Sequence, residues 1–243
     1  MRFAEIENEV ETLSLIGGCE KIFEEVNEMN TLEYISKDDQ KVVQELAKRD
    51  FGPKVYSFAR CMVDDVKRAI DAGVKGVIME VPASPHLIEK GYRWELDRAI
   101  DLSIESTSFA RDQGLEVVFF PIDFTRSDLV WVCDLIERVG KEGHMDGLAL
   151  VDTMGATSIH AMQFFVRTMK NRFPDIPLEA HFHMDFGMGI ANTIMALSEG
   201  VEVIQSTVLG VGSTISINLL WILISKCSLE SLSTCGDLIT QYR

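Results

Sequence analysis

The sequence has little positive charge and no cysteine pattern of the kind that builds a disulfide framework. It carries 23 lysine and arginine residues against 38 aspartate and glutamate residues, which gives a formal net charge of −15. Such a chain offers no general positive field to attract phosphates, so we expect neither a nucleic-acid partner nor an anionic membrane partner. The five cysteines are an odd number without CxxC spacing, which predicts buried thiols in a reducing cytoplasm.

A secretion signal, a membrane span and nucleotide-binding fingerprints are also missing. The first residues, MRFAEIENEVETL, are acidic where a signal peptide is basic and then apolar. Residues 203–225 carry no charge, but polar side chains interrupt them. Because a span needs roughly 20 predominantly apolar residues, we expect a buried strand followed by a core helix. No GxGxxG follows a predicted strand and no GxxxxGK[ST] occurs, which removes the nucleotide-binding signatures of open α/β sheets.

The sequence does contain an alternation of helix and strand patterns from residue 36 onward. Hydrophobic residues make up 47% of the chain, enough for a large core. Gly73 is expected to end the second helix, Ser127 to cap the fourth, and Thr157 or Ser158 to cap the fifth. The predicted strands are 55–59, 76–81, 115–123, 147–153, 178–183 and 201–208. The predicted helices are 36–51, 63–72, 93–113, 127–139, 157–172 and one that ends at Gly200.

Strands separated by helices predict an α/β fold built on a parallel sheet. Continuous hydrophobic strands indicate a sheet covered on both faces, and right-handed crossovers leave a closed (β/α)8 barrel or an open doubly wound sheet. The missing nucleotide fingerprints favour the barrel, which has eight strands in about 250 residues. Residues 1–35 have mainly helical patterns, with a doubtful strand at 32–35. We therefore predict a single TIM-type barrel domain over residues 1–243 that is incomplete, with six clear strands, the first strand missing and the second doubtful.

Polar side chains stand at the carboxyl ends of the predicted strands, where barrels place their chemistry. Residues i and i+2 of a strand point to the same face, so His181 and His183 are expected to face the barrel mouth while Phe182 packs against a helix. Two imidazoles on one face suit a divalent transition metal, and two hydrogen-bonded strand-end histidines are the alternative. Asp185 follows closely and is placed to hold a ring N–H. The other polar residues at strand ends are Glu80, Asp123, Thr125, Arg126, Asp152, Thr153 and Thr207.

Each of the other candidates also has two interpretations. The Thr153 hydroxyl is a candidate for binding a substrate carboxylate, with Gly155 letting the backbone approach it; alternatively, Asp152 and Thr153 begin the next helical turn. Arg126 is a candidate for receiving an anion, or an ordinary surface arginine. His86, after the second strand, is a candidate base or a solvated loop histidine.

Assembled, these segments resemble the pyruvate carboxyltransferase-type barrels, also called DRE-TIM metallolyases. The resemblance covers roughly residues 36–212, most of the chain. HFHMDFGMGIAN resembles the family's HxH-x-D-x-G-x-x-x-AN segment, DTMGATS its DTxG strand end, and FFPIDFTRSD the end of its fifth strand. TVLGVG resembles the start of the loop after strand eight. The family includes isopropylmalate, homocitrate and citramalate synthases and hydroxymethylglutaryl-CoA lyase.

The resemblance implies a cytoplasmic transferase of amino-acid biosynthesis that condenses acetyl-CoA with a 2-oxo acid. A homodimer is also compatible with this resemblance. A divalent metal (Mn, Mg or Zn) held by His181 and His183 chelates the oxo acid, a base removes a methyl proton from acetyl-CoA, and the thioester is hydrolysed after the enolate attacks. Thr153 is implied to contact the oxo acid. The full candidate set is His86, Asp123 and Arg126 as catalytic residues, Asp152, Thr153 and Thr207 as substrate-binding residues, His181 and His183 as metal ligands, and Asp185 as their support.

Two segments depart from the family pattern. The family's Arg-Asp-Gly-Glu segment, which supplies a metal-binding aspartate at the end of strand one, does not occur here, and the chain is expected to begin in the helix after that strand. The loop after strand eight is GVGSTI where the family has GxGERxGN, so Asn218 is not assigned as a ligand. The alternatives are a non-catalytic barrel remnant or partner-dependent subunit, and a lyase or aldolase, although GVGST lacks the cysteine that the lyases carry there.

Overall fold

The structure, a computed structural model, describes residues 37–49 and 54–205. Its helices are α2 (Lys37–Lys48), α3 (Val63–Ala72), α4 (Leu96–Asp112), α5 (Leu129–Glu142), α6 (Ile159–Arg172) and α7 (Gly189–Ser198). Its strands are β1 (Tyr56–Arg60), β2 (Gly76–Pro82), β3 (Glu116–Ile122), β4 (Gly147–Asp152), β5 (Leu178–Phe182) and β6 (Val203–Ile204). Two short helical turns, η1 (Leu87–Tyr92) and η2 (Phe124–Arg126), follow β2 and β3.

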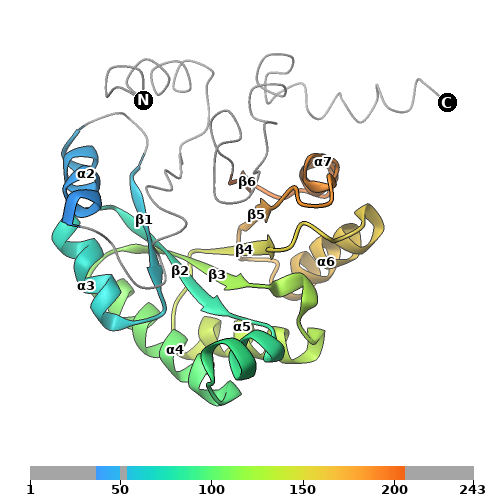
Figure 1. Cartoon of the computed structure of the whole chain (residues 1–243), viewed down its shortest axis with the longest axis horizontal. Helices are drawn as coiled ribbons and strands as arrows, with labels where there is room; N and C mark the ends of the chain where they lie inside the picture. Colours follow the sequence, from blue (N-terminus) through green and yellow to red (C-terminus); the bar gives the residue numbers. More distant parts are fainter. Residues whose placement is uncertain (1–36, 50–53, 206–243) are drawn as a thin grey trace.

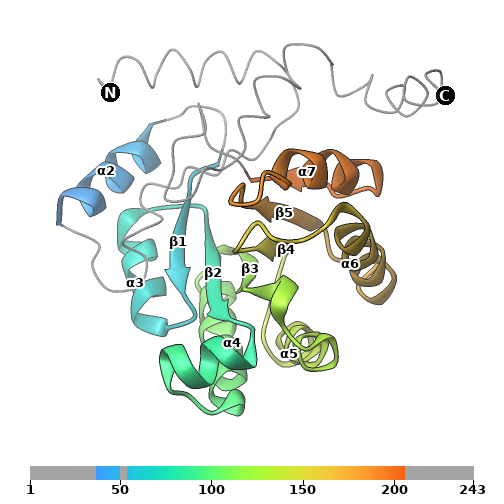
Figure 2. The ribbon, with the colours of Figure 1, turned by 45° about the vertical axis from the view of Figure 1, so that its right-hand side comes forward.

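The strands form one parallel sheet whose spatial order follows the sequence, from β1 to β6. Helices α3 to α7 lie in an arc on the outer side of this curved sheet (Figures 1 and 2). An open doubly wound sheet reverses its strand order at a switch point, whereas crossovers that all advance in one direction curve the sheet into a barrel. The predicted TIM-type α/β fold is therefore confirmed. Within the described residues the barrel is not closed, because β1 and β6 are the two edges of the sheet.

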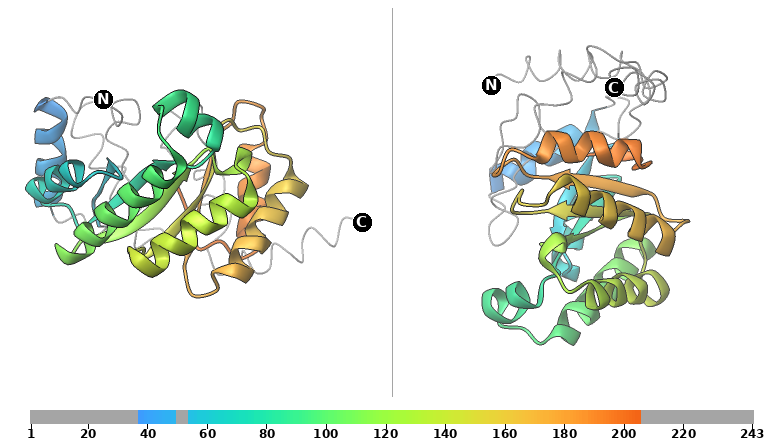
Figure 3. Two further views of the ribbon diagram at one scale, coloured as in Figure 1. Left: turned by 90° about the horizontal axis from the view of Figure 1, so that it is seen from below. Right: turned by 90° about the vertical axis from the view of Figure 1, so that its right-hand side faces the viewer.

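Neighbouring helices of the arc pack against one another, α3 on α4, α4 on α5 and α6 on α7 (Figure 3). The helix boundaries correct two predictions. Asp128, not Ser127, caps α5, since its carboxylate accepts a hydrogen bond from the Trp131 N–H at 2.9 Å, while the Ser127 hydroxyl donates to the Asp123 carbonyl. The helix predicted from residue 93 begins at Leu96, because residues 87–92 form the π-helical turn η1 and the residue after it has φ 57°.

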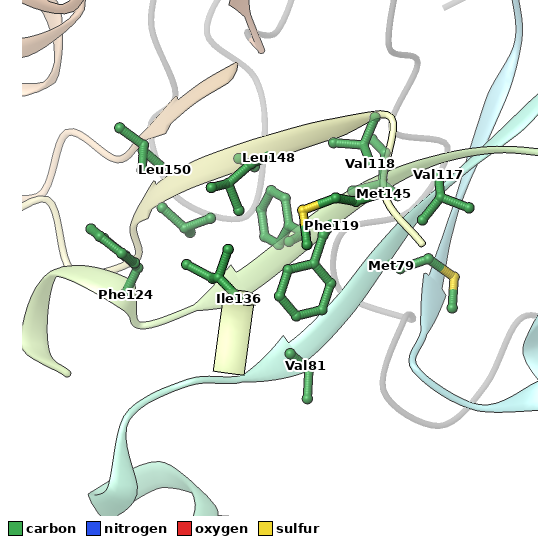
Figure 4. Close-up of a cluster of buried hydrophobic side chains, with 14 of the residues drawn as sticks. Met79, Val81, Val117, Val118, Phe119, Phe124, Ile136, Met145, Leu148 and Leu150 are labelled. Atoms are coloured by element: carbon green, nitrogen blue, oxygen red, sulfur yellow. The ribbon is translucent and has the colours of Figure 1, made fainter. Parts of the chain in front are cut away.

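The hydrophobic core lies between the sheet and the arc of helices. Met79 of β2, Phe119 of β3, Leu148 of β4 and Ile136 of α5 are fully buried and belong to one hydrophobic cluster (Figure 4). Burying a side chain of this size contributes about 1.5–3 kcal/mol. These residues fix the outer face of the sheet, so their neighbours in the sequence must face the barrel interior.

The interior face carries a layer of rings that alternate strands supply. The Phe58 ring of β1 meets the Phe120 ring of β3 edge-on at 4.9 Å, and Phe120 meets the imidazole of His181 on β5 at the same distance. In TIM barrels, interior layers are built by side chains from every second strand. This layer shows that His181 points into the barrel.

Several predictions concern residues outside the described ranges. They are the helices and doubtful strand of residues 1–35, the end of the strand at 201–208, the core helix that follows it, and the role of Thr207. In the described ranges, none of the helices has the length and apolar character that crossing a membrane requires.

Candidate active site

The two histidines of β5 and its end bring their ring nitrogens together. The Nε2 atoms of His181 and His183 are 3.2 Å apart, and both side chains are buried. The i, i+2 spacing on a strand therefore places both rings on the interior face, as predicted, while Phe182 between them is buried on the helix side. In the metal-free chain one Nε2 donates a hydrogen bond to the other.

A hydrogen-bond chain fixes which nitrogen of His181 carries its proton. The Gln205 side-chain amide donates to Glu179 at 2.8 Å, so its oxygen must face the ring, where it lies 3.0 Å from His181 Nδ1. An amide oxygen only accepts, and Nδ1 must therefore be the protonated nitrogen. The lone pair of His181 is left on Nε2, the atom that faces His183, and His183 is the donor between the two rings. Imidazoles that bind metals are held in this way by an acceptor on the opposite nitrogen.

The spacing of these nitrogens fits a shared divalent ion. Two nitrogen ligands about 2.1 Å from one ion, at angles of roughly 90–110°, lie about 3.0–3.4 Å apart. The observed 3.2 Å between Nε2 atoms falls in this range. Over residues 37–49 and 54–205, no group of three or more histidine, cysteine, aspartate or glutamate side chains is gathered for a metal.

The loop after β4 packs directly against the end of β5. Gly155 has φ 57°, and a Cβ there would lie 2.7 Å from the His183 carbonyl oxygen. Only glycine allows this approach without strain. The Asp152 carboxylate accepts hydrogen bonds from the Thr125 hydroxyl at 3.0 Å and from the Thr157 N–H at 3.1 Å. Asp152 thus holds the loop that approaches His183.

The loop after β3 is organised by a buried carboxylate. Asp123 adopts φ 64° and is 1% exposed. Its oxygens receive two hydrogen bonds from the Arg126 guanidinium, at 2.6 and 2.9 Å, and one from the Ser84 hydroxyl. This pairing raises the pKa of Arg126. The Asp123 N–H donates to the Thr153 hydroxyl oxygen at 2.8 Å, so the Thr153 O–H proton remains available to donate to a ligand.

The HMGL-like family profile matches residues 1–222. This chain belongs to the HMGL-like family. The resemblance to the pyruvate carboxyltransferase-type barrels is thereby confirmed, and the matched range includes residues 1–35, which the motifs alone did not reach.

Curated relatives of this family member are synthases. The chain is 34% identical over 178 residues to the Archaeoglobus fulgidus protein named "Putative (R)-citramalate synthase CimA", a match that covers 73% of this chain and 36% of that protein. It is 30% identical over 191 residues to the mitochondrial homocitrate synthase of Schizosaccharomyces pombe, covering 79% of this chain and 45% of that protein. The chain therefore spans less than half the length of these relatives.

Solved structures of HMG-CoA lyases share the fold of this HMGL-like chain. The Bacillus subtilis enzyme has a TM-score of 0.70 at 16% identity and covers 91% of this chain and 93% of that one. The Pseudomonas aeruginosa enzyme has a TM-score of 0.69 at 19% identity, covering 85% and 75%. Identities this low establish the barrel architecture alone.

Three predicted site residues remain: two are exposed, and one lies outside residues 37–49 and 54–205. His86 is exposed just before η1, and Asp185 is exposed in the turn after β5. Thr207 follows the last described residue, Gln205. Gln205, rather than Asp185, is the residue that binds the ring N–H of His181. The predicted roles of these residues remain predictions.

Sequence reasoning missed Gln205, which binds His181, and Glu179, which binds Gln205, and it gave no role to Glu80. Glu179 lies two residues before His181, and a charged residue inside a buried strand was the available signal for it. Gln205 is one of several polar residues in the segment 201–208, and nothing in the sequence singled it out. Glu80 is 8% exposed, and burial raises its pKa to about 7.

Proposed function

We propose that the chain is a metal-dependent condensing transferase that joins the acetyl group of acetyl-CoA to a 2-oxo acid. The convergence of the His181 and His183 Nε2 atoms carries this proposal. Two further findings support it: the family to which the chain belongs and the synthases among its relatives.

The described residues have distinct tasks in this reaction. His181 and His183 would hold Mn, Mg or Zn, and the ion when bound acts as a Lewis acid on the oxo acid's carbonyl. Glu179 and Gln205 keep the His181 Nε2 lone pair directed at the ion. The Thr153 hydroxyl donates a hydrogen bond to the oxo acid's carboxylate.

The loops supply the rest of the site. The Asp123–Arg126 pair keeps the loop after β3 in place, and it holds Thr153 through the Asp123 N–H. Arg126, half-exposed at the strand ends, is assigned to an anionic group of the substrates. His86 is assigned to proton transfer at the mouth of the barrel. The reaction yields a hydroxy diacid and free coenzyme A after hydrolysis of the thioester.

The test is release of free thiol from acetyl-CoA by the full chain in buffer containing Mn²⁺, Mg²⁺ or Zn²⁺. Pyruvate, 2-oxoisovalerate and 2-oxoglutarate are supplied separately, and one of them should support release. His181→Gln should abolish it, whereas His160→Gln, which changes an exposed histidine of α6, should not.

The alternatives give different results in the same assay. No release with any oxo acid would refute the condensing reaction. Cleavage of hydroxymethylglutaryl-CoA instead would identify a lyase. A chain that neither reacts nor binds metal would be a non-catalytic or partner-dependent subunit.

A further inference from the structure

Glu80 points into the same barrel interior as the histidines. In the parallel sheet it pairs with Arg60 of β1 and Phe120 of β3, and residues paired in this way face the same side. The ring of Phe120 contacts the imidazole of His181. Phe120 therefore lies between Glu80 and His181 on the interior face of the sheet.

The Glu80 side chain borders a hollow at the carboxyl ends of β1 and β2. The hollow has room for about one water-sized group, and Arg60, Tyr92 and Trp94 also line it. The rings of Tyr92 and Trp94 lie 4.9 Å apart and form its wall on the η1 side. A hollow of this size can admit a single methyl group beside the Glu80 carboxyl, but not a whole cofactor.

The carboxyl of Glu80 is uncommitted, in contrast to the other acidic groups of the interior. Asp123, Asp152 and Glu179 each accept hydrogen bonds from neighbouring side chains or backbone. Among the described residues, no side chain or backbone group hydrogen-bonds or ion-pairs with the Glu80 carboxyl. Burial without a hydrogen-bond partner disfavours the charged form of a carboxyl, so Glu80 is able to hold a proton.

Four groups from the surrounding elements face Glu80: Arg60, Cys61, Asp65 and Tyr92. Arg60 of β1 lowers its pKa and Asp65 of α3 raises it, while burial has the largest effect and brings it to about 7. Arg60 is itself committed to Asp65 through bonds of 2.7 and 3.1 Å, so it does not pair with Glu80. The Tyr92 hydroxyl, from η1, and the buried Cys61 thiol both have raised pKa values and are neutral at pH 7. Glu80 can therefore both accept and donate a proton near neutral pH.

We propose that Glu80 is the base that removes the methyl proton of acetyl-CoA, with the acetyl methyl group placed at the hollow beside it. This inference rests on the proposed condensing function. The C–H bond breaks, Glu80 takes the proton, and the electron pair forms the enolate of the thioester. The enolate carbon bonds to the oxo acid's carbonyl carbon, whose oxygen becomes an alkoxide and receives the proton back from Glu80. Protons and electrons balance without an outside acid or oxidant.

The experiment compares Glu80→Gln and Glu80→Asp with Glu89→Gln, a control on η1 whose side chain is exposed. Two rates are measured for each: thiol release with the oxo acid that the wild type uses, and deuterium incorporation from D₂O into the acetyl methyl group. E80Q should lower kcat for both by about 100-fold or more, with the KM for the oxo acid and the metal content unchanged. E80D should retain part of both rates, and E89Q should match the wild type.

A pH profile separates a base from a merely structural residue. The wild-type rate should rise with pH through an apparent pKa near 7, and this step should be missing from the residual rate of E80Q. If E80Q releases thiol and exchanges deuterium at wild-type rates, the assignment of Glu80 is overturned while the condensing function stands. If the wild type itself releases no thiol with any oxo acid, the function fails and the assignment with it.

Discussion

Replacing Glu80 by glutamine should stabilise the fold at alkaline pH and leave it nearly unchanged at acid pH. Burial raises the pKa of this carboxyl from 4.5 to about 7. Between these values the folded chain keeps a proton that the unfolded chain has released, so the free energy of unfolding falls as pH rises and the loss is complete above pH 7. At about 1.4 kcal/mol per pKa unit, the loss reaches up to about 3 kcal/mol.

Urea denaturation of the wild type and E80Q at pH 5 and pH 8.5 measures this effect. Glutamine does not titrate, so the change in the stability difference between the two pH values comes from the Glu80 carboxyl. E80Q should exceed the wild type by about 3 kcal/mol at pH 8.5 and by much less at pH 5. The exposed control E89Q should differ little from the wild type at either pH. An equal stability difference between E80Q and the wild type at both pH values would refute the reasoning. Greater stability combined with lost activity is the behaviour expected of a functional group kept at a cost.

Three further predictions concern other parts of the site. Gly155→Ala should destabilise the fold more than Gly114→Ala in thermal unfolding. Both glycines have positive φ, so either alanine should cost about 1–2 kcal/mol of backbone strain, but only at Gly155 do backbone atoms lie within 3 Å of the added Cβ. Equal losses of stability would contradict the close contact between Gly155 and His183. Gln205→Leu should weaken Mn²⁺ binding by about 10–100-fold in calorimetry; unchanged affinity would remove Gln205 from the site. Asp128→Ala should cost about 1 kcal/mol in urea denaturation; a neutral result would disprove the cap on α5.

Features that depend on local pattern were predictable from the sequence. The run GVIMEV indicated a buried strand because hydrophobic residues fill both faces, and β2 is buried along its length. The i, i+2 spacing of His181 and His183 placed both rings on one face without knowledge of the fold. Gly73 was expected to end its helix, and it does so with φ 78°.

Features that depend on contacts between distant segments were not predictable. Gln205 meets His181 only because β6 pairs with β5 in one particular register. The commitment of Asp123 to Arg126 and Ser84 depends on the path of two loops. Glu80 looked like any strand-end acid, and its burial beside η1 follows from a π-helical turn for which the sequence gives no periodic signal.

The most direct measurement is a crystal structure of the chain grown with Mn²⁺, with the ion located by anomalous scattering. The account predicts one peak within bonding distance of Nε2 of both His181 and His183, with Nδ1 of His181 still bound to Gln205. No peak at this place, with the two Nε2 atoms still hydrogen-bonded to each other at saturating Mn²⁺, would contradict it.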